Sequence, residues 1–517
     1  MKRIVLLLAL AWAALPPAGA QQVAAPCQNG TAVLDGVTYS CRDIDLLAVL
    51  PHSVFSSPGT TAPPTLQGVR SNEVWGWTDP QTGREYALMG LTDGTAFIDV
   101  TVPAAPVYLG KLPAATNPSL WRTLRVYRDH VFVGSEALGH GVQVFDLRRL
   151  RGLTGNPVET FTADARYTGA GKTHTLFINE QTGFLYLAGA NQAGFQCRGG
   201  GLHIVDVRDP RNPQFAGCYD ANAYTHETHC EVYAGPDARY AGREICVQYQ
   251  GAFTRQNNHV AFVDVTDKAN PVLISRVTYP DPGYTHQGWF TEDRRFLFVN
   301  DELDDSRHPA RTVVIDVQDL ELPQFVGHYQ APVAATDHNL YIVGRYMYQS
   351  NYESGVRIVD VGGMPDLASV REVAHFDTHP QSNTIEMNGN WHLYPYFASG
   401  TLVANDMQNG LFLLRFNDAL RSDAEPPPAG GAVLSPGEPN PFTGATTLTL
   451  RVSEAQRVRA EVFDMSGRRV AVLYDGDASP GAAQRLTFEA GALPAGVYVV
   501  RVQGETFTAS QRVTLSR

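Results

Sequence analysis

Residues 284–329 decide the fold of this chain, and they read YTHQGWFTEDRRFLFVNDELDDSRHPARTVVIDVQDLELPQFVGHY. This stretch predicts four short strands, namely HQGWFTE, RRFLFVN, RTVVIDV and PQFVGHY. In each of them β-branched and aromatic residues alternate or run in short blocks, and Asp, Asn and Pro mark the breaks. One such sheet cannot bury both its faces alone. Because the unit recurs along the chain, we expect the copies to stack face to face in a closed ring.

Six copies of an apolar–Asp–apolar strand reveal the repeat, with spacings of 47, 60, 58, 52 and 44 residues. Their aspartates are Asp99, Asp146, Asp206, Asp264, Asp316 and Asp360. A seventh copy, GLFLLR at 410–415, keeps the pattern without the Asp. Propeller blades repeat every ~40–50 residues. The sequence therefore predicts an all-β chain in which residues 43–416 form a seven-bladed β-propeller.

The seventh blade has no outer strand of its own, and residues 43–50, DIDLLAVL, have the missing character. We predict that this strand completes the last blade, because closure removes an exposed sheet edge. Residues 21–42 are expected to form a disulfide-tied cap. Residues 417–440 are rich in Pro, Gly and Ala and predict a linker. Residues 441–517 contain alternating segments that predict a small C-terminal β-sandwich.

The first 20 residues have the basic start, apolar run and small-residue end of a secretory signal peptide. No later stretch has the ~18 apolar residues of a spanning helix, so no transmembrane helix is expected. The net charge is −12. An acidic chain of this kind argues against nucleic acid as the partner. Together these features predict an exported protein.

Six cysteines follow the leader, and an even number in an oxidising compartment predicts disulfides. The parsimonious pairs are Cys27–Cys41, Cys197–Cys218 and Cys230–Cys246. Two other pairings among the last four cysteines remain open. No CxxC spacing is present, so the thiols are not expected to bind metal.

The C-terminal region resembles the type A sorting domain of the type IX secretion system. The matching segments are PNPF at 439–442, VFDMSGRRV at 462–470 and LPAGVY at 493–498. The resemblance implies that the type IX secretion machinery recognises this domain as an address. It also implies a route through the periplasm and the outer membrane, after which the protein is secreted or held at the cell surface.

The predicted propeller resembles the choice-of-anchor B family, which is built of LVIVD-type repeats. The resemblance covers roughly residues 27–416. FVDVTDKANP at 262–271, YTHQGW at 284–289 and DHNLYI at 337–342 are among the segments that carry it. It implies an architecture and a location at the cell surface, but no reaction.

Histidine recurs at one position of the repeat, where the innermost strand of a blade begins. These residues are His174, His226, His286 and His338. The inner strands of a propeller surround its central channel, so four imidazoles there could bind a divalent metal such as Zn²⁺, or another ligand. The alternative is that each histidine is a structural tether to the strand aspartate of its own or a neighbouring blade.

Four carboxylates crowd the loop that follows one strand, and they are Asp301, Glu302, Asp304 and Asp305. Dense carboxylates on a loop suit Ca²⁺, which prefers oxygen ligands. The alternative is a solvated acidic loop. Zinc at the histidines or calcium at this loop would be the cofactor.

Tryptophan is the other residue type that could contact a ligand. The candidates are Trp75, Trp77, Trp289 and Trp391. They fit packing between blades, but any that line a channel mouth could stack on a sugar or a peptide.

No nucleophile elbow, zinc-protease helix or phosphate-binding loop is present, so no catalytic residue is predicted. We therefore expect an exported binding module for a protein, glycan or peptide rather than an enzyme. One alternative is a metal-dependent enzyme with a histidine-lined channel. The other is a structural envelope protein.

Overall fold

The computed structural model describes residues 25–56, 64–68, 70–197, 199–220, 224–253, 257–304 and 308–417, and in the C-terminal part 432–435, 437, 439–452, 455–464, 468–478, 484–491, 493–504 and 507–516. The predicted signal peptide lies outside the described residues. The chain divides into two compact units, residues 1–418 and 419–517. Each unit has its own hydrophobic core.

The described part of the N-terminal unit contains seven antiparallel sheets, each built outward from an inner strand. The first is β4 (Ser71–Thr78), β5 (Glu85–Leu91), β6 (Gly94–Asp99) and β7 (Val107–Pro113), with the short parallel β11 (Glu159–Thr160) added at its edge. The second is β8 (Arg122–Tyr127), β9 (His130–Ser135), β10 (Val142–Asp146) and β12 (Ala165–Tyr167). The third is β13 (Thr175–Asn179), β14 (Phe184–Ala188), β15 (Leu202–Asp206) and β16 (Gln214–Tyr219). The fourth is β17 (Glu227–Val232), β18 (Glu244–Gln250), β19 (His259–Asp264) and β20 (Val272–Val277).

The fifth sheet comes from the repeat at 284–329. It is β21 (Thr285–Phe290), β22 (Phe296–Asp301), β23 (Arg311–Asp316) and β24 (Gln324–Gln330). The sixth is β25 (Asn339–Val343), β26 (Tyr346–Ser350), β27 (Val356–Asp360), β28 (Arg371–Phe376), β2 (Val37–Arg42) and β1 (Thr31–Leu34). The seventh is β29 (Asn390–Tyr394), β30 (Thr401–Asp406), β31 (Gly410–Phe416) and β3 (Ile44–Leu50). Three 3₁₀ turns accompany them, η1 (His52–Phe55), η2 (Leu147–Leu150) and η3 (Leu367–Ser369).

The sheets follow one another around a ring. Each inner strand contacts the inner strand of the next sheet, and β29 of the last sheet contacts β4 of the first. Apolar residues of neighbouring sheets share one core, as Val247 and Phe262 do with Leu297 and Ile315. Every residue of β22 is buried, because both faces of its sheet are covered. This arrangement is a β-propeller, which confirms the all-β class and the propeller of the N-terminal unit.

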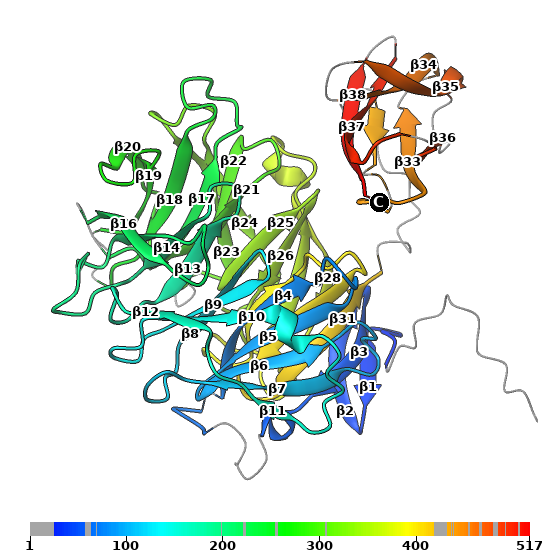
Figure 1. Ribbon diagram of the computed structural model, residues 1–517. Helices are drawn as coiled ribbons and strands as arrows, with labels where there is room; N and C mark the ends of the chain where they lie inside the picture. Colours follow the sequence, from blue (N-terminus) through cyan, green and yellow to red (C-terminus); the bar gives the residue numbers. More distant parts are fainter. Residues whose placement is uncertain are drawn as a thin grey trace, which may run out of the picture. The chain divides into compact units, whose positions relative to one another are not determined.

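β3 joins the two ends of the propeller chain. It pairs antiparallel with β31 of the seventh sheet (Figure 1). In this pairing Leu46 lies opposite Leu414. Both leucines are fully buried. The pairing gives β31 an outer neighbour and links chain segments that are far apart in sequence.

The repeated aspartates end the third strand of their sheets. Each accepts a hydrogen bond at Oδ1 from the backbone N–H two residues later, for example from Thr101 to Asp99 and from Gln318 to Asp316. Such Asx turns redirect the chain after a strand. An arginine pairs with each of the six aspartates, as Arg345 does with Asp360. The aspartates therefore serve the turns, and the proposed tether to the channel histidines is wrong.

The predicted N-terminal cap is continuous with a sheet. Hairpin β1–β2 extends the sixth sheet, since Cys41 of β2 lies opposite Phe376 of β28. The three parsimonious disulfides are confirmed: Cys27–Cys41, Cys197–Cys218 and Cys230–Cys246.

The described residues of the C-terminal unit form two sheets. One is β32 (Ala432–Leu434), β33 (Ala445–Val452) and β36 (Gln484–Glu489). The other is β35 (Arg469–Ala478), β34 (Gln456–Asp464), β37 (Gly496–Gln503) and β38 (Thr508–Leu515). β32 lies inside the predicted linker and pairs with β33, so the linker prediction was too long at this end. A three-residue strand is too short to show periodicity among Pro and Gly.

Two buried histidines outside the channel are expected to make the folded protein less stable in acid. His52 lies between the Gln408 carbonyl and the Ser71 hydroxyl, and Tyr167 donates to Nε2 of His203 at 2.7 Å. Burial lowers the pKa of both histidines to about 4. Because the folded-state pKa is below the unfolded value of about 6.5, the neutral form stabilises the fold above pH 6.5.

This contribution is lost as the pH falls from about 6.5 toward 4, up to about 3 kcal/mol for each histidine. Urea unfolding at pH 7 and pH 4.5 measures it. The double variant His52→Gln/His203→Gln should lose less stability over that interval than the wild type. An unfolding free energy that is flat between the two pH values would contradict the prediction.

Candidate functional site

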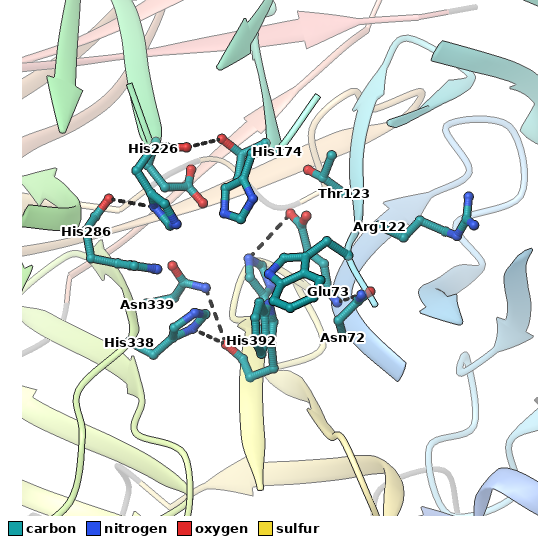
Figure 2. A pocket seen from close by; sticks show the side chains of 14 residues that line it. Asn72, Glu73, Arg122, Thr123, His174, His226, His286, His338, Asn339 and His392 are labelled. Atoms are coloured by element: carbon teal, nitrogen blue, oxygen red, sulfur yellow. Dashed lines mark hydrogen bonds and ion pairs between the residues drawn. The ribbon is translucent and has the colours of Figure 1, made fainter. Parts of the chain in front are cut away.

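The four repeated histidines meet at one end of the central channel. His174, His226 and His338 each precede an inner strand by one residue, and His286 is the second residue of β21. All four are buried and line one cavity together with Glu73 and other residues at the starts of inner strands. Figure 2 shows the four imidazoles on one side of this cavity and Glu73 on the other. The cavity has a volume of about 20 Å³, enough for one water molecule or ion.

The imidazoles follow one another as neighbours around the channel. Ring centroids are 4.2 Å apart for His174 and His226, 4.2 Å for His226 and His286, and 4.3 Å for His286 and His338. The ring of Trp391 lies 4.5 Å beyond His338. Residues that are 52 or 60 positions apart in sequence thus form one continuous row.

Hydrogen bonds orient three of the four rings. Nδ1 of His226 contacts the carbonyl of His286 at 3.4 Å, and Nδ1 of His338 contacts the carbonyl of Trp391 at 2.7 Å. Nδ1 of His174 contacts Glu136 Oε1 at 2.6 Å. A carbonyl only accepts, so His226 and His338 carry their proton on Nδ1 and have a lone pair on Nε2.

Burial keeps His226, His286 and His338 neutral. Burial, with a smaller effect of the His174 imidazole, lowers the pKa of His286 to about 3. Burial, with smaller effects of the His286 and His174 imidazoles, lowers the pKa of His338 to about 3. Burial lowers the pKa of His226 well below its ordinary value, and His174, His286 and His338 act in the same direction. Neutral imidazole is the form that coordinates metals.

The structure does not bring the predicted calcium ligands together. Both oxygens of Asp301 are occupied, because the Tyr279 hydroxyl and the Gly283 N–H donate to Oδ2 and the Tyr284 N–H donates to Oδ1. Asp304 pairs with Arg311. Asp305 lies outside the described residues.

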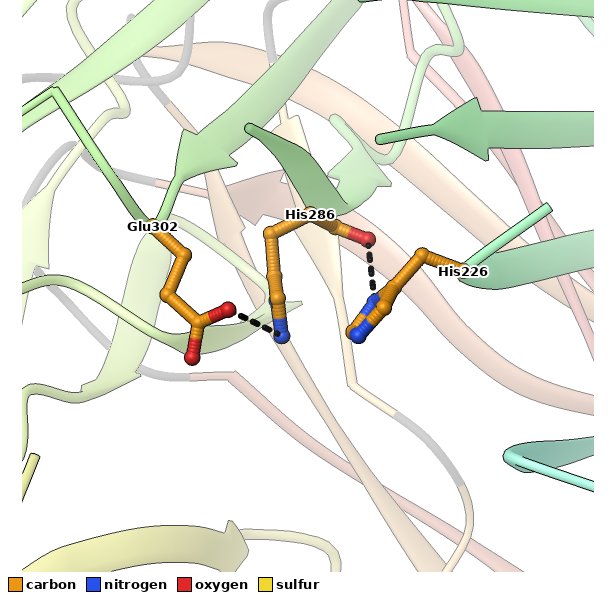
Figure 3. A group of neighbouring side chains, drawn as sticks. All are labelled: His226, His286 and Glu302. Atoms are coloured by element: carbon orange, nitrogen blue, oxygen red, sulfur yellow. Dashed lines mark hydrogen bonds and ion pairs between the residues drawn. The ribbon is translucent and has the colours of Figure 1, made fainter. Parts of the chain in front are cut away.

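Glu302 is the carboxylate of this loop that turns toward the channel. Its oxygens lie 3.6 Å from His286 Nε2 and 3.7 Å from His338 Nε2. The Tyr352 hydroxyl donates to Oε1 at 2.5 Å. His226, His286 and Glu302 offer donor atoms that all lie within 4.8 Å of one another (Figure 3).

A second cavity lies where the inner strands end, and it is much larger. Its volume is about 770 Å³. Aromatic side chains from several sheets line it, namely Trp75, Trp77, Phe177, Trp289, Tyr394 and Tyr396. Trp77 is 4% exposed and stacks on Tyr86, so it mainly packs the core. Trp391 lies at the histidine end, which separates it from the other three predicted tryptophans.

A buried ion pair lies between the two cavities. Arg125 donates to Glu73, and its guanidinium lies 4.3 Å from the ring centroid of Trp75. Glu73 lines the histidine cavity and Arg125 lines the aromatic one. The pair therefore separates the two spaces within the channel.

Sequence reasoning missed several residues of these cavities. His392 lines the histidine cavity from the seventh sheet, and its Nε2 accepts from the Tyr341 hydroxyl at 2.7 Å. Glu227 lines the same cavity, and burial raises its pKa to about 7. Glu227 directly follows His226, and His392 belongs to the corresponding strand of the last repeat. The position of each residue within its repeat was the signal in the sequence that could have placed it at the histidine cavity.

Comparison with known proteins identifies two segments of the chain. Residues 439–516 match the secretion system C-terminal sorting domain, and residues 197–221 match the LVIVD repeat. The C-terminal sorting domain indicates export by the type IX secretion system, whose machinery it contacts, so the protein is secreted or held at the cell surface. No helix among the described residues is long and apolar enough to cross a membrane.

Two solved structures are among those similar to this chain. The β-propeller domain of Cps50 (Swd1) from Myceliophteria thermophila is 13% identical at a TM-score of 0.41, covering 68% of this chain and 97% of that one. The extracellular domain of a B. thetaiotaomicron protein is 11% identical at a TM-score of 0.41, covering 95% of this chain and 61% of that one. No curated protein matches the chain.

Proposed function

We propose that this exported propeller is a glycan-binding protein whose ligand occupies the aromatic cavity at the end of the inner strands. The observation that carries the proposal is a cavity of about 770 Å³ lined by aromatic side chains from several sheets. Ligand sites commonly have volumes of ~300–1,000 Å³ and a mainly apolar lining with a few polar groups.

Several of these aromatic rings are open to a ligand. Tyr396 is 37% exposed, and Trp75, Phe177, Trp289 and Tyr394 are half-buried. Trp75 and Tyr394 lie against each other with centroids 5.2 Å apart, and Tyr394 contacts Tyr396 at 5.3 Å. A group of rings held in place by one another can stack against the apolar face of a sugar at little entropic cost.

The polar lining favours an uncharged ligand rich in hydroxyls. Arg128, Asp129 and Glu180 line the cavity, with Arg125 below Trp75 already paired with Glu73. With one cation and two carboxylates, the cavity has no strong electrostatic potential of one sign. These side chains supply both hydrogen-bond donors and acceptors. The hydroxyl groups of a glycan can pair with both kinds.

In this proposal the two units have different functions. The C-terminal unit directs the chain through the periplasm to the secretion machinery, and the propeller binds its ligand after export. The signal peptide supplies the first step of that route. The division of labour requires no contact between the units.

Replacing Tyr396 by alanine should weaken glycan binding about tenfold, or ~1.4 kcal/mol, because an exposed stacking ring is lost. The full chain is first bound to an array of neutral oligosaccharides, and the best binder is titrated by calorimetry. Phe253→Ala is the matched control, since Phe253 is 82% exposed and does not line the cavity.

Two outcomes would contradict the proposal. One is the absence of binding to any oligosaccharide at millimolar concentration. The other is binding that Tyr396→Ala leaves unchanged. Binding of a linear peptide library in place of the array, weakened by Tyr396→Ala, would keep the cavity but replace the ligand class.

A further inference from the structure

The histidine end of the channel contains a buried set of donor atoms that a glycan in the aromatic cavity does not use. It lies at the opposite end of the inner strands, beyond the pair of Arg125 and Glu73. The geometry points to a site for one divalent transition-metal ion, held by Nε2 of His226, Nε2 of His286 and the carboxylate of Glu302.

The tautomers favour coordination. Nδ1 of His226 is committed to the His286 carbonyl, so its Nε2 is the atom free to bind. Metal-bound histidines commonly donate their other N–H to a carbonyl or carboxylate, which sets the ring orientation. His338 and His174 have the same arrangement beside the site, toward Trp391 and Glu136.

The spacing of the donors is too long for hydrogen bonds and suits an ion between them. His286 Nε2 and Glu302 are 3.6 Å apart, beyond the usual hydrogen-bond range. Ligands at 2.0–2.1 Å from a tetrahedral ion lie about 3.3 Å from each other. The three donors are all within 4.8 Å of one another, so small side-chain shifts complete such a site.

The surroundings of His286 leave its Nε2 for an ion. His286 is 1% exposed, and on the Nδ1 side the backbone of His338 is its hydrogen-bonding neighbour, although the contact is not of standard geometry. On the Nε2 side the Glu302 carboxylate lies 3.6 Å away, too far for a good hydrogen bond. An ion on Nε2 gives the imidazole a strong partner that the protein itself does not provide.

The donor set indicates the class of metal. Two imidazoles and one carboxylate suit Zn²⁺, Fe²⁺, Cu²⁺ or Ni²⁺, whereas Ca²⁺ and Mg²⁺ prefer oxygen. Three protein ligands leave a coordination position open, as in sites that bind water or substrate. His174 and His338 flank the site. Their rings are placed to contact whatever fills that position.

The test uses the full chain, purified without a histidine tag, and Zn²⁺ alone as the probe. Equilibrium dialysis with elemental analysis should find one zinc per chain. His286→Ala and Glu302→Gln should each weaken zinc binding by at least about 100-fold. His259→Ala is the matched control, because His259 is half-buried outside the channel, and it should bind like the wild type.

A wild-type measurement keeps the inference testable if a variant fails to fold. X-ray absorption of the zinc-loaded chain should report two imidazoles and a carboxylate oxygen at about 2.0–2.1 Å. Less than a tenth of an equivalent of zinc on the wild type would overturn the inference. So would zinc retained with unchanged affinity in folded His286→Ala and Glu302→Gln, or a spectrum without imidazole.

Discussion

Replacing Leu46 by aspartate is expected to lower the free energy of unfolding by about 5 kcal/mol, enough to open the ring. Leu46 is fully buried in β3 and lies opposite Leu414 of β31. The substitution removes a core side chain, which alone costs ~2–5 kcal/mol for leucine, and buries a carboxylate without a partner. Domains have only ~5–15 kcal/mol of stability in total.

Denaturant unfolding and limited proteolysis measure this effect. Leu414→Asp should act similarly, because it faces the same contact from the last sheet. Val33→Asp is the matched control: Val33 is 57% exposed on β1, so a change within about 0.5 kcal/mol is expected. Wild-type-like stability of Leu46→Asp would show that the joint between β3 and β31 does not hold the ring.

Removing Arg125 should have the second-largest effect, about 3–5 kcal/mol. Arg125 and Glu73 form an ion pair in which both side chains are 7% exposed. In Arg125→Met the Glu73 carboxylate remains buried and loses its cation, and an unpaired buried charge is strongly destabilising. The cation beside Trp75 is lost as well, so the floor of the aromatic cavity loosens.

A double-mutant cycle separates the charge from the packing. Arg125→Met/Glu73→Gln should be more stable than Arg125→Met, because the neutral amide carries no unpaired charge. Arg128→Met serves as the control, since Arg128 is exposed and lines the same cavity. A double variant less stable than the single variant would refute the explanation by unpaired charge.

Much of the propeller followed from local pattern. The strands of 284–329 were predictable because alternation and turn residues are local properties of the chain. The role of residues 43–50 was expected from a count of the strands in each repeat. The last repeat lacked its outer strand, and the sheet edge left exposed would be unfavourable. The cysteine pairs were predictable because each cysteine bonds a partner close in sequence, at separations of 14, 21 and 16 residues.

The short strand β32 and the sheet-like cap were not predictable in the same way. β32 has three residues, and its pairing with β33 supplies order that its composition does not suggest. The sequence of hairpin β1–β2 suggests a disulfide-tied loop. In the structure β2 pairs with the edge of β28, and this pairing positions the hairpin. In both cases a distant partner strand decides the structure.

The histidines show the limit most clearly. Their recurrence at one repeat position, visible in the sequence alone, was enough to place His174, His226, His286 and His338 at the channel. Glu302 lies beside His226 and His286 rather than with the other carboxylates of its loop, and only the tertiary structure shows this.

Sequence by itself thus determined the strands of the repeats and the meeting of the four histidines, because strand pattern and repeat position are properties of the chain alone. Tertiary structure decided which further side chains share a cavity: Trp391 lies with the histidines, whereas Trp75 lines the aromatic cavity. The physical reason is that residues from different sheets meet only when the sheets close around the channel, and the contacts between sheets are not a property of any one strand.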